Sequence, residues 1–245
     1  MDEQMRDHFN RSVGGYDAYT RKSYSLQRER KAWQRMYREI LGSSDQTVLN
    51  IGCGPGTEAM ALADAGFTVT AVDFSPKMVE AAKRNAEDNN LSILILEGDA
   101  EDLQFEDGSF DCVVSNYAMW AIPNPDKALS EFWRVLKPGG ILAYADTGNR
   151  KTDHKHLRKI WVKIAVRMRD RDGNSHKGES TQEDRDRIRK LWSSGADRPA
   201  KDLQMAKDAG FRDVTIHSDL NRRVFKGTRY IEYGYTNGFL LVARK

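Results

Sequence analysis

The sequence has few cysteines and lacks long apolar runs. Its two cysteines, Cys53 and Cys112, are too few for a disulfide framework or a closed zinc site, and both stand in apolar contexts typical of small buried side chains. No apolar run reaches the roughly 18 residues of a membrane span, and the N-terminus has no apolar signal-peptide core. We therefore expect a cytoplasmic protein that neither spans a membrane nor is secreted.

A large excess of one charge sign is also missing from the chain as a whole, whose net charge is +3 over 245 residues. The distribution is uneven, however. Residues 150–190 contain 14 Lys or Arg and 7 Asp or Glu, so this segment carries +7 and the rest of the chain −4. Such a local basic excess can attract an anionic small molecule or a nucleic acid, or it can be the solvated face of helices.

Apolar runs and helix-forming stretches alternate regularly across the middle of the chain. Five runs predict strands, at residues 47–51, 68–72, 92–97, 111–115 and 141–145. Three intervening stretches predict helices, at residues 57–65, 77–87 and 126–136. The strands are apolar throughout, which is typical of a parallel sheet covered by helices on both faces. Because crossovers between parallel strands are right-handed, we predict an α/β fold with a doubly wound sheet.

The flanks of this alternating region have a different character. Residues 23–41 predict one amphipathic helix. Residues 150–200 contain two charged helical stretches, 154–169 and 182–192, and look like an insertion after the fifth strand. The alternation then resumes with a helix at 203–209, a strand at 214–218 and extended segments at 230–235 and 238–243.

Three glycines follow the first predicted strand, at Gly52, Gly54 and Gly56. Glycines allow a sharp turn and close approach to a ligand, and the helix that begins beside them offers free N–H groups. Asp73 ends the second strand, where a carboxylate can accept from both hydroxyls of a ribose. Dinucleotide-binding folds use G-x-G-x-x-G, whereas here Thr57 stands at the third glycine position. The spacing therefore disfavours, without excluding, a nicotinamide-dependent oxidoreductase.

At this point the sequence resembles the class I S-adenosylmethionine-dependent methyltransferases, and in particular the small-molecule branch with a methyltransferase-11 type domain. Four segments carry the resemblance, in order and with suitable spacing: VLNIGCGPG at 48–56, VDFSPKMVEAAK at 72–83, GDAEDLQFEDGSFDCVVS at 98–115 and EFWRVLKPGGIL at 131–142. The resemblance implies a Rossmann-like methyltransferase fold with a mostly parallel seven-stranded sheet. It also implies S-adenosyl-L-methionine as methyl donor and S-adenosyl-L-homocysteine as product.

The resemblance also implies roles for cofactor-binding residues. The glycine loop would face the methionine moiety, Asp73 the ribose, the next residues the adenine, and the end of the fourth strand the sulfonium. The residues concerned are Gly52, Cys53, Gly54, Gly56, Asp73, Phe74, Met78, Asp99, Ala100, Ser115 and Asn116. Met78 has core packing as its alternative role, and Asp99 has capping of a turn.

Asn50 departs from the family, which usually has an acid at this position. Its amide oxygen can still accept from the cofactor's ammonium group, although without the charge, or its side chain can simply hold the loop. The N-terminal segment resembles the family's lid, in which Tyr16 would close over the methionine end; the alternative is a tail that packs on the surface.

Methyl transfer is an in-line displacement, so the protein mainly aligns the reactants, excludes water and, where needed, removes a proton. His154 and His156, at the start of the inserted segment, are candidate bases, although a single histidine is more often a surface residue. They are too few to indicate a metal. Candidates on the acceptor side follow the fourth and fifth strands: Tyr117, Met119, Trp120, Asp146, Thr147 and Asn149.

We expect a single methyltransferase domain over residues 1–245. It would comprise an N-terminal helical lid (1–44), a cofactor-binding core (45–149), a basic cap (150–200) and C-terminal strands (201–245). The basic cap predicts a small acceptor that carries negative charge, with O-, N-, C- and S-methylation all open. RNA or protein methylation through the cap is the alternative, but Ser115-Asn116-Tyr117-Ala118 lacks the prolines of N6-adenine methyltransferases. A non-enzymatic cofactor-binding module, and either a monomer or a homodimer, also remain open.

Overall fold

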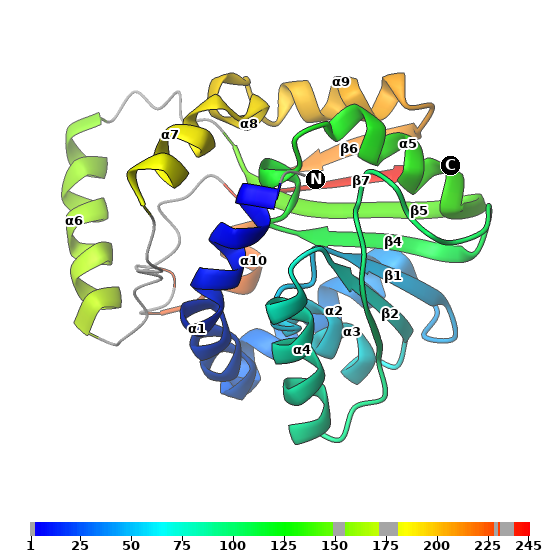
Figure 1. Ribbon diagram of the computed structural model, residues 1–245, viewed down its shortest axis with the longest axis horizontal. Coiled ribbons are helices and arrows are strands. Elements are labelled where there is room, and N and C mark those ends of the chain that lie inside the picture. The colour runs from blue at the N-terminus through cyan, green and yellow to red at the C-terminus, as the bar shows by residue number, and fades with distance from the viewer. Residues whose placement is uncertain (1–2, 149–154, 172–180, 228–229, 231–237) are drawn as a thin grey trace.

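A computed structural model describes residues 3–148, 155–171, 181–227, 230 and 238–245 (Figure 1). Its centre is a seven-stranded sheet with the order β3-β2-β1-β4-β5-β7-β6. All neighbours are parallel except β7, which is antiparallel to β5 and to β6. The strands are β1 (Thr47–Ile51), β2 (Thr68–Asp73), β3 (Leu94–Glu97), β4 (Phe110–Asn116), β5 (Leu136–Thr147), β6 (Arg212–His217) and β7 (Gly238–Arg244). This arrangement confirms the predicted doubly wound, mostly parallel sheet.

Helices cover both faces of the sheet, so the strands bury apolar side chains in two cores. One core packs α2, α3, α4 and α10 against the sheet, and the other packs α5 and α9. The helices are α1 (Glu3–Ser25), α2 (Gln27–Leu41), α3 (Thr57–Asp64), α4 (Pro76–Asp88), η1 (Met119–Ala121), α5 (Pro125–Val135), α6 (Lys155–Arg171), α7 (Gln182–Lys190), α8 (Trp192–Gly195), α9 (Ala200–Asp208) and α10 (Leu220–Val224).

The helix predicted over residues 23–41 is wrong in its boundaries. The chain forms two helices that meet at Leu26, whose ψ of 84° is not helical. The Ser25 hydroxyl donates to the Lys22 carbonyl at 2.6 Å and so competes with the backbone where α1 ends. Residues 23–25 therefore belong to α1.

The fifth strand also begins earlier than predicted. Leu136, expected at the end of a helix, instead pairs with Phe110 of β4, and an irregularity in register follows before Cys112 pairs with Ile141. The third strand begins at Leu94 rather than at residue 92. Of the extended segment predicted at 230–235, residues 231–235 lie outside the described part of the chain.

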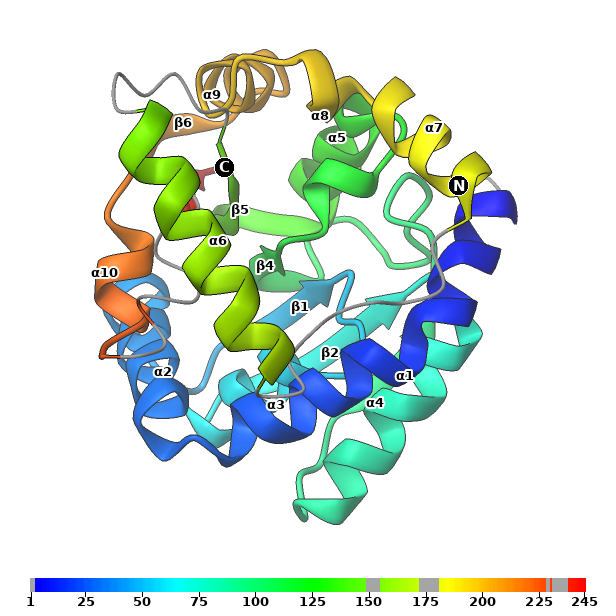
Figure 2. The same cartoon turned by 90° about the vertical axis from the view of Figure 1, so that its left-hand side faces the viewer.

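Helix α1 lies across the edge of the sheet where β1 and β2 end (Figure 2). The hydroxyls of Thr20 in α1 and Thr57 at the start of α3 are 2.7 Å apart. Farther along α1, Asp17 accepts from the amide of Asn85 in α4 at 2.7 Å. Ligands of doubly wound sheets bind at this edge, so α1 forms one wall of the expected site.

Candidate active site

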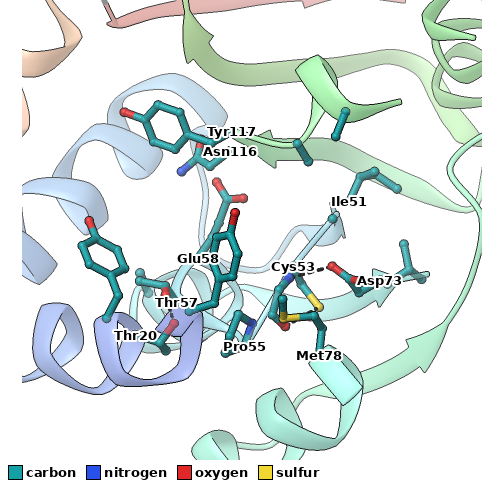
Figure 3. A pocket seen from close by; sticks show the side chains of 18 of the residues that line it. Thr20, Ile51, Cys53, Pro55, Thr57, Glu58, Asp73, Met78, Asn116 and Tyr117 are labelled. Atoms are coloured by element: carbon teal, nitrogen blue, oxygen red, sulfur yellow. Dashed lines mark hydrogen bonds between the residues drawn. The ribbon is translucent and has the colours of Figure 1, made fainter. Parts of the chain in front are cut away.

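A pocket of about 410 Å³ opens at the carboxyl ends of β1, β2 and β4 (Figure 3). Its walls come from the glycine loop, from α1 and α2, and from the segment that follows β4. The charged side chains that line it, within the described part of the chain, are Arg30, Glu58 and Asp73. Much of the remaining lining is apolar or aromatic.

The glycine loop holds its shape through backbone geometry. Gly52, Gly54 and Gly56 have φ values of 63°, 51° and 95°, a region that favours glycine. A Cβ atom on Gly52 would lie 2.3 Å from the Cβ of Ala118, so the loop runs directly against the segment after β4. The Cys53 amide donates to the Val72 carbonyl at 3.0 Å, which joins the loop to β2.

Asp73 lies at the end of β2 and faces the pocket beside this loop. Its carboxylate accepts from the backbone amides of Gly54 at 2.8 Å and Ser75 at 2.9 Å. Burial raises the pKa of Asp73 to about 6, even though these amides favour the ionised form. The carboxylate is thus oriented by the backbone, with lone pairs left for ligand hydroxyls.

The apolar end of the pocket includes Phe74, Met78 and Ala100, whose predicted contacts with the adenine stay predictions. Met78 follows Ser75, whose hydroxyl accepts from the Met78 amide at 3.3 Å and caps α4. Asp99 is not among the described lining residues, and its carboxylate accepts from the Glu101 amide at 2.9 Å. Its predicted contact with adenine therefore stays a prediction.

A hydrogen-bonded network that the sequence did not predict lies beside the ends of β1 and β4. The Asn50 amide donates to Glu58 Oε2 at 2.6 Å, and the Tyr37 hydroxyl donates to Glu58 Oε1. The Asn116 amide in turn donates to the Tyr37 hydroxyl at 2.7 Å. Burial raises the pKa of Glu58 to about 7. The only sequence signal for Glu58 was its place in the first turn of α3.

The predicted residues of this region divide into two groups. Gly52, Cys53, Gly54 and Asn116 line the pocket. By contrast, Asn50, Gly56 and Ser115 are not among the described lining residues, and the side chains of Asn50 and Ser115 are fully buried. Their predicted cofactor contacts stay predictions.

Aromatic side chains dominate the wall formed by α1, α2 and the segment after β4. They are Phe9, Tyr16, Tyr19, Tyr24, Trp33, Tyr37, Tyr117 and Trp120, and Phe225, directly after α10, adds a further ring to the pocket. Burial, and secondarily the Asp73 carboxylate, raise the pKa of Tyr16. Burial likewise raises the pKa of Tyr117, next to Tyr19. Both phenols are therefore protonated at neutral pH and act as hydrogen-bond donors rather than bases.

Not every candidate on the acceptor side reaches the pocket. Tyr117, Trp120 and Thr147 line it, whereas Met119 and Asp146 are fully buried and are not among the described lining residues. Asn149, His154 and the side chain of His156 lie outside the described part of the chain.

Asp146 instead belongs to a buried ionic cluster at the end of β5. Arg198 Nη1 lies 3.0 Å from Asp146, and Arg198 Nε donates to Asp202 of α9 at 2.8 Å. The same oxygen of Asp146, Oδ2, also accepts from the Trp120 backbone amide at 3.0 Å. A carboxylate expected to face the donor methyl thus holds the backbone of the acceptor wall.

The lid and the cap touch through α1 and α7. Both oxygens of Asp184 accept from Arg11 at 3.0 Å, and His8 Nδ1 lies 3.3 Å from the same carboxylate. Beyond α7, the Trp192 indole donates to the Ile122 carbonyl at 2.9 Å. None of the described residues of the basic cap lines the pocket.

Neither a metal site nor a membrane-spanning helix occurs in the described part of the chain. No group of three metal-ligating side chains is found there. None of the helices in the same residue ranges combines the length and the apolar character needed to cross a bilayer.

Comparison with known proteins finds methyltransferases. Residues 49–144 match the family described as "Methyltransferase domain". A demethylmenaquinone methyltransferase from Renibacterium salmoninarum is 39% identical over 117 residues, which are 47% of this chain and 48% of that protein. Another from Staphylococcus saprophyticus is 29% identical over 222 residues, which are 88% of this chain and 91% of that protein. The match thus spans about half of the first relative and most of the second.

Solved structures share the fold at low sequence identity. A methyltransferase from Aquifex aeolicus superposes with a TM-score of 0.57 at 20% identity, covering 86% of this chain and 88% of the other. Phosphoethanolamine N-methyltransferase 2 from Haemonchus contortus, in complex with S-adenosyl-L-methionine, gives 0.58 at 20% identity, covering 86% and 51%. These likenesses show the methyltransferase fold, and residues 49–144 match the methyltransferase domain, in agreement with the resemblance to the class I S-adenosylmethionine-dependent methyltransferases.

Proposed function

We propose that this chain transfers a methyl group from S-adenosylmethionine to a small aromatic acceptor. The observation that carries the proposal is that the pocket lining is of two kinds, which we take to form two ends. The glycine loop and Asp73 form one end, and aromatic side chains of α1, α2 and the segment after β4 form the other. Such a pocket can hold a nucleoside-containing donor and a flat acceptor side by side.

On the donor side, each residue has a distinct task. The backbone of Gly52 and Gly54 allows close approach of the methionine end, and Asp73 accepts from the ribose hydroxyls. Phe74 and Met78 flank the adenine. When bound, S-adenosylmethionine supplies an electrophilic methyl group on a sulfonium. The protein's contribution is to align the acceptor with that group and to exclude water.

On the acceptor side, the aromatic wall supports a planar, largely apolar substrate. Tyr16 is proposed to close over the methionine end, because it lines the pocket from α1. The names of the two relatives specify demethylmenaquinone, a quinone, as their substrate. A quinone-like or phenolic ring fits the same wall.

The predicted negative charge on the acceptor needs a cation at the pocket. Arg30 is the lining cation in the described part of the chain. Its guanidinium lies over the Tyr24 ring at 4.7 Å and 3.6 Å from Asp64. We propose that an acidic group on the acceptor would face Arg30 rather than the cap.

The arrangement of the parts supports one domain over residues 1–245, with the lid, core, cap and C-terminal strands in the predicted ranges. The ion pairs between Arg11 of the lid and Asp184 of the cap favour a joint action of these two parts over the pocket. The predicted cytoplasmic location stays a prediction.

Calorimetry tests the donor side. S-adenosylhomocysteine should bind with micromolar-range affinity, and Asp73→Asn should weaken it at least about tenfold, since hydrogen bonds to a charged group contribute about 1.5–3 kcal/mol. Asp88→Asn, at the exposed end of α4, is the control and should bind normally. A wild-type protein that binds no S-adenosylhomocysteine would refute the proposed function.

Labelled S-adenosylmethionine in a cell extract tests the acceptor. We expect the label in small molecules that pass into an organic solvent. Label that stays in the aqueous small-molecule fraction would favour a strongly anionic acceptor instead. Label in acid-precipitable RNA or protein would contradict the proposal and support the cap-mediated alternative.

A further inference from the structure

Glu58 is a buried carboxylate at the pocket that lacks an opposite charge among the described residues. It lines the pocket from the first turn of α3 and is 8% exposed. Its hydrogen-bond donors are neutral: the Asn50 side-chain amide, the Tyr37 hydroxyl and the backbone amide of Asn116. A buried carboxylate without a cation is costly, and the high pKa of Glu58 has this cause. A cationic ligand group would offset that cost.

The carboxylate is held in a fixed orientation, as expected of a binding group. One oxygen accepts from Asn50 at 2.6 Å and the other from Tyr37, which is itself anchored by Asn116 at 2.7 Å. A carboxylate has about four acceptor positions, and Asn50, Tyr37 and the Asn116 backbone amide occupy three, so about one remains for a ligand. Figure 3 shows Glu58 inside the pocket, with Asn116 and Tyr117 nearby.

Unsatisfied acceptors surround the same place. Asn50 Oδ1 and Asn116 Oδ1 are buried and have no hydrogen-bond partner. Asn50 and Asn116 stand on neighbouring parallel strands, β1 and β4, where both strands end. Of the two residues, Asn116 lines the pocket with Glu58, whereas Asn50 lies behind them. A buried acceptor without a donor costs about 1–3 kcal/mol, so Glu58 and Asn116 Oδ1 together fit a ligand group with more than one N–H donor.

We propose that Glu58, oriented by Asn50 and Tyr37, binds the α-ammonium group of S-adenosylmethionine. The inference rests on the proposed function in taking this cofactor as the ligand. The ammonium carries one positive charge and three N–H donors, which match a carboxylate with a free acceptor position beside the unpartnered amide oxygen of Asn116. Asn50, the amide where an acid was expected, then acts as the donor that positions an acid on the neighbouring helix.

A general-base role for Glu58 accounts for fewer of these observations. A base needs a path to the acceptor's proton, but it does not need a surrounding group of additional acceptors. Glu58 also lies beside the glycine loop, at the methionine end, and both of its oxygens already accept from protein donors.

Calorimetry with two ligands tests this assignment. S-adenosylhomocysteine contains the ammonium group, whereas 5′-methylthioadenosine lacks it. Glu58→Gln should weaken the first about 10- to 100-fold and leave the second within about twofold. Asp64→Asn is the matched control: it is on the same helix, and its carboxylate also accepts from a tyrosine, Tyr24, at 2.6 Å. It should change neither affinity.

The exchange of the two side chains tests whether the charge itself matters. In the double variant N50D/E58Q, the carboxylate and the amide change places across the 2.6 Å hydrogen bond. This variant should recover most of the affinity for S-adenosylhomocysteine that Glu58→Gln loses.

Three results would overturn the assignment. They are unchanged binding of S-adenosylhomocysteine by Glu58→Gln, an equal loss of both ligands, and a folded double variant with no recovery. If the wild type binds neither ligand, the proposed function itself fails, which separates the two conclusions.

Discussion

The two ends of the pocket are built in different ways. At the cofactor end, the decisive contacts join residues close in sequence and involve the backbone, such as the Gly54 amide with Asp73, 19 residues apart. Behind the acceptor end they join residues far apart, such as the side chains of Arg11 and Asp184, 173 residues apart, and the Ser193 hydroxyl with the Trp120 carbonyl, 73 apart. Motif and strand order thus suffice for the glycine loop and Asp73, though not for Glu58, whereas the second end depends on how the lid and cap pack.

The largest expected effect comes from removing Arg198, whose buried ion pair with Asp146 supports the backbone of the acceptor wall. Arg198→Met leaves Asp146 and Asp202 buried without their cation, which should lower the free energy of unfolding by about 3–5 kcal/mol. Urea unfolding measures this loss. Arg223→Met, in a half-exposed pair with Asp219, should cost less than about 1 kcal/mol. A similar loss in both variants would contradict the buried cluster's importance.

A matched pair of glycine substitutions tests whether the cofactor end depends on the backbone. Gly52→Ala places a Cβ 2.3 Å from that of Ala118, whereas Gly54→Ala meets nothing within 4 Å, although both positions have positive φ. Gly54→Ala should cost about 1 kcal/mol, and Gly52→Ala about 1–3 kcal/mol more. Thermal unfolding and S-adenosylhomocysteine affinity measure both. Equal effects would show that the contact with Ala118 can relax freely.

The pH dependence of stability tests the buried carboxylates of the cofactor end. Because burial raises the pKa of Glu58 to about 7, the unfolded chain loses this proton at lower pH than the folded protein does. The free energy of unfolding should therefore fall as pH rises from about 5 to about 8. Glu58→Gln should reduce that fall by about 2 kcal/mol.

In Glu58→Gln, the free energy of unfolding should still depend partly on pH, because the pKa of Asp73 is also raised, to about 6. Urea unfolding at the two pH values gives the comparison. An identical fall in wild type and Glu58→Gln would mean that Glu58 does not titrate in this range.

The smallest effect is expected where the lid meets the cap. Asp184→Asn weakens the contacts with Arg11 and His8 and should cost about 1–2 kcal/mol of stability. The KM of the acceptor should rise. The affinity for S-adenosylhomocysteine should stay within about twofold, because the contact between α1 and α7 is not part of the cofactor end. Asp186→Asn, exposed on the same helix, is the control. A loss of cofactor affinity in Asp184→Asn alone would contradict the separation of the two ends.

The sequence by itself determined the core of this protein. Apolar strands alternating with helices predicted the parallel sheet, and the loop from Gly52 to Gly56 with Asp73 marked one end of the pocket. These predictions needed only local order, because consecutive parallel strands bring their carboxyl ends to one edge of a sheet. The Ser75-Pro76 and Asn124-Pro125 pairs likewise mark helix starts that the structure has, at α4 and α5.

Only the tertiary structure decided which distant side chains meet. Glu58 had no distinguishing sequence signal. Its partner Tyr37 was predicted only to lie on the apolar face of the amphipathic helix over residues 23–41. Asp146 was expected at the donor methyl, but Arg198, 52 residues later, holds it in the interior. Hydrophobic periodicity tells which face of a helix is buried, but not what that face meets. The acceptor end, formed where such faces meet, therefore became visible only in the folded chain.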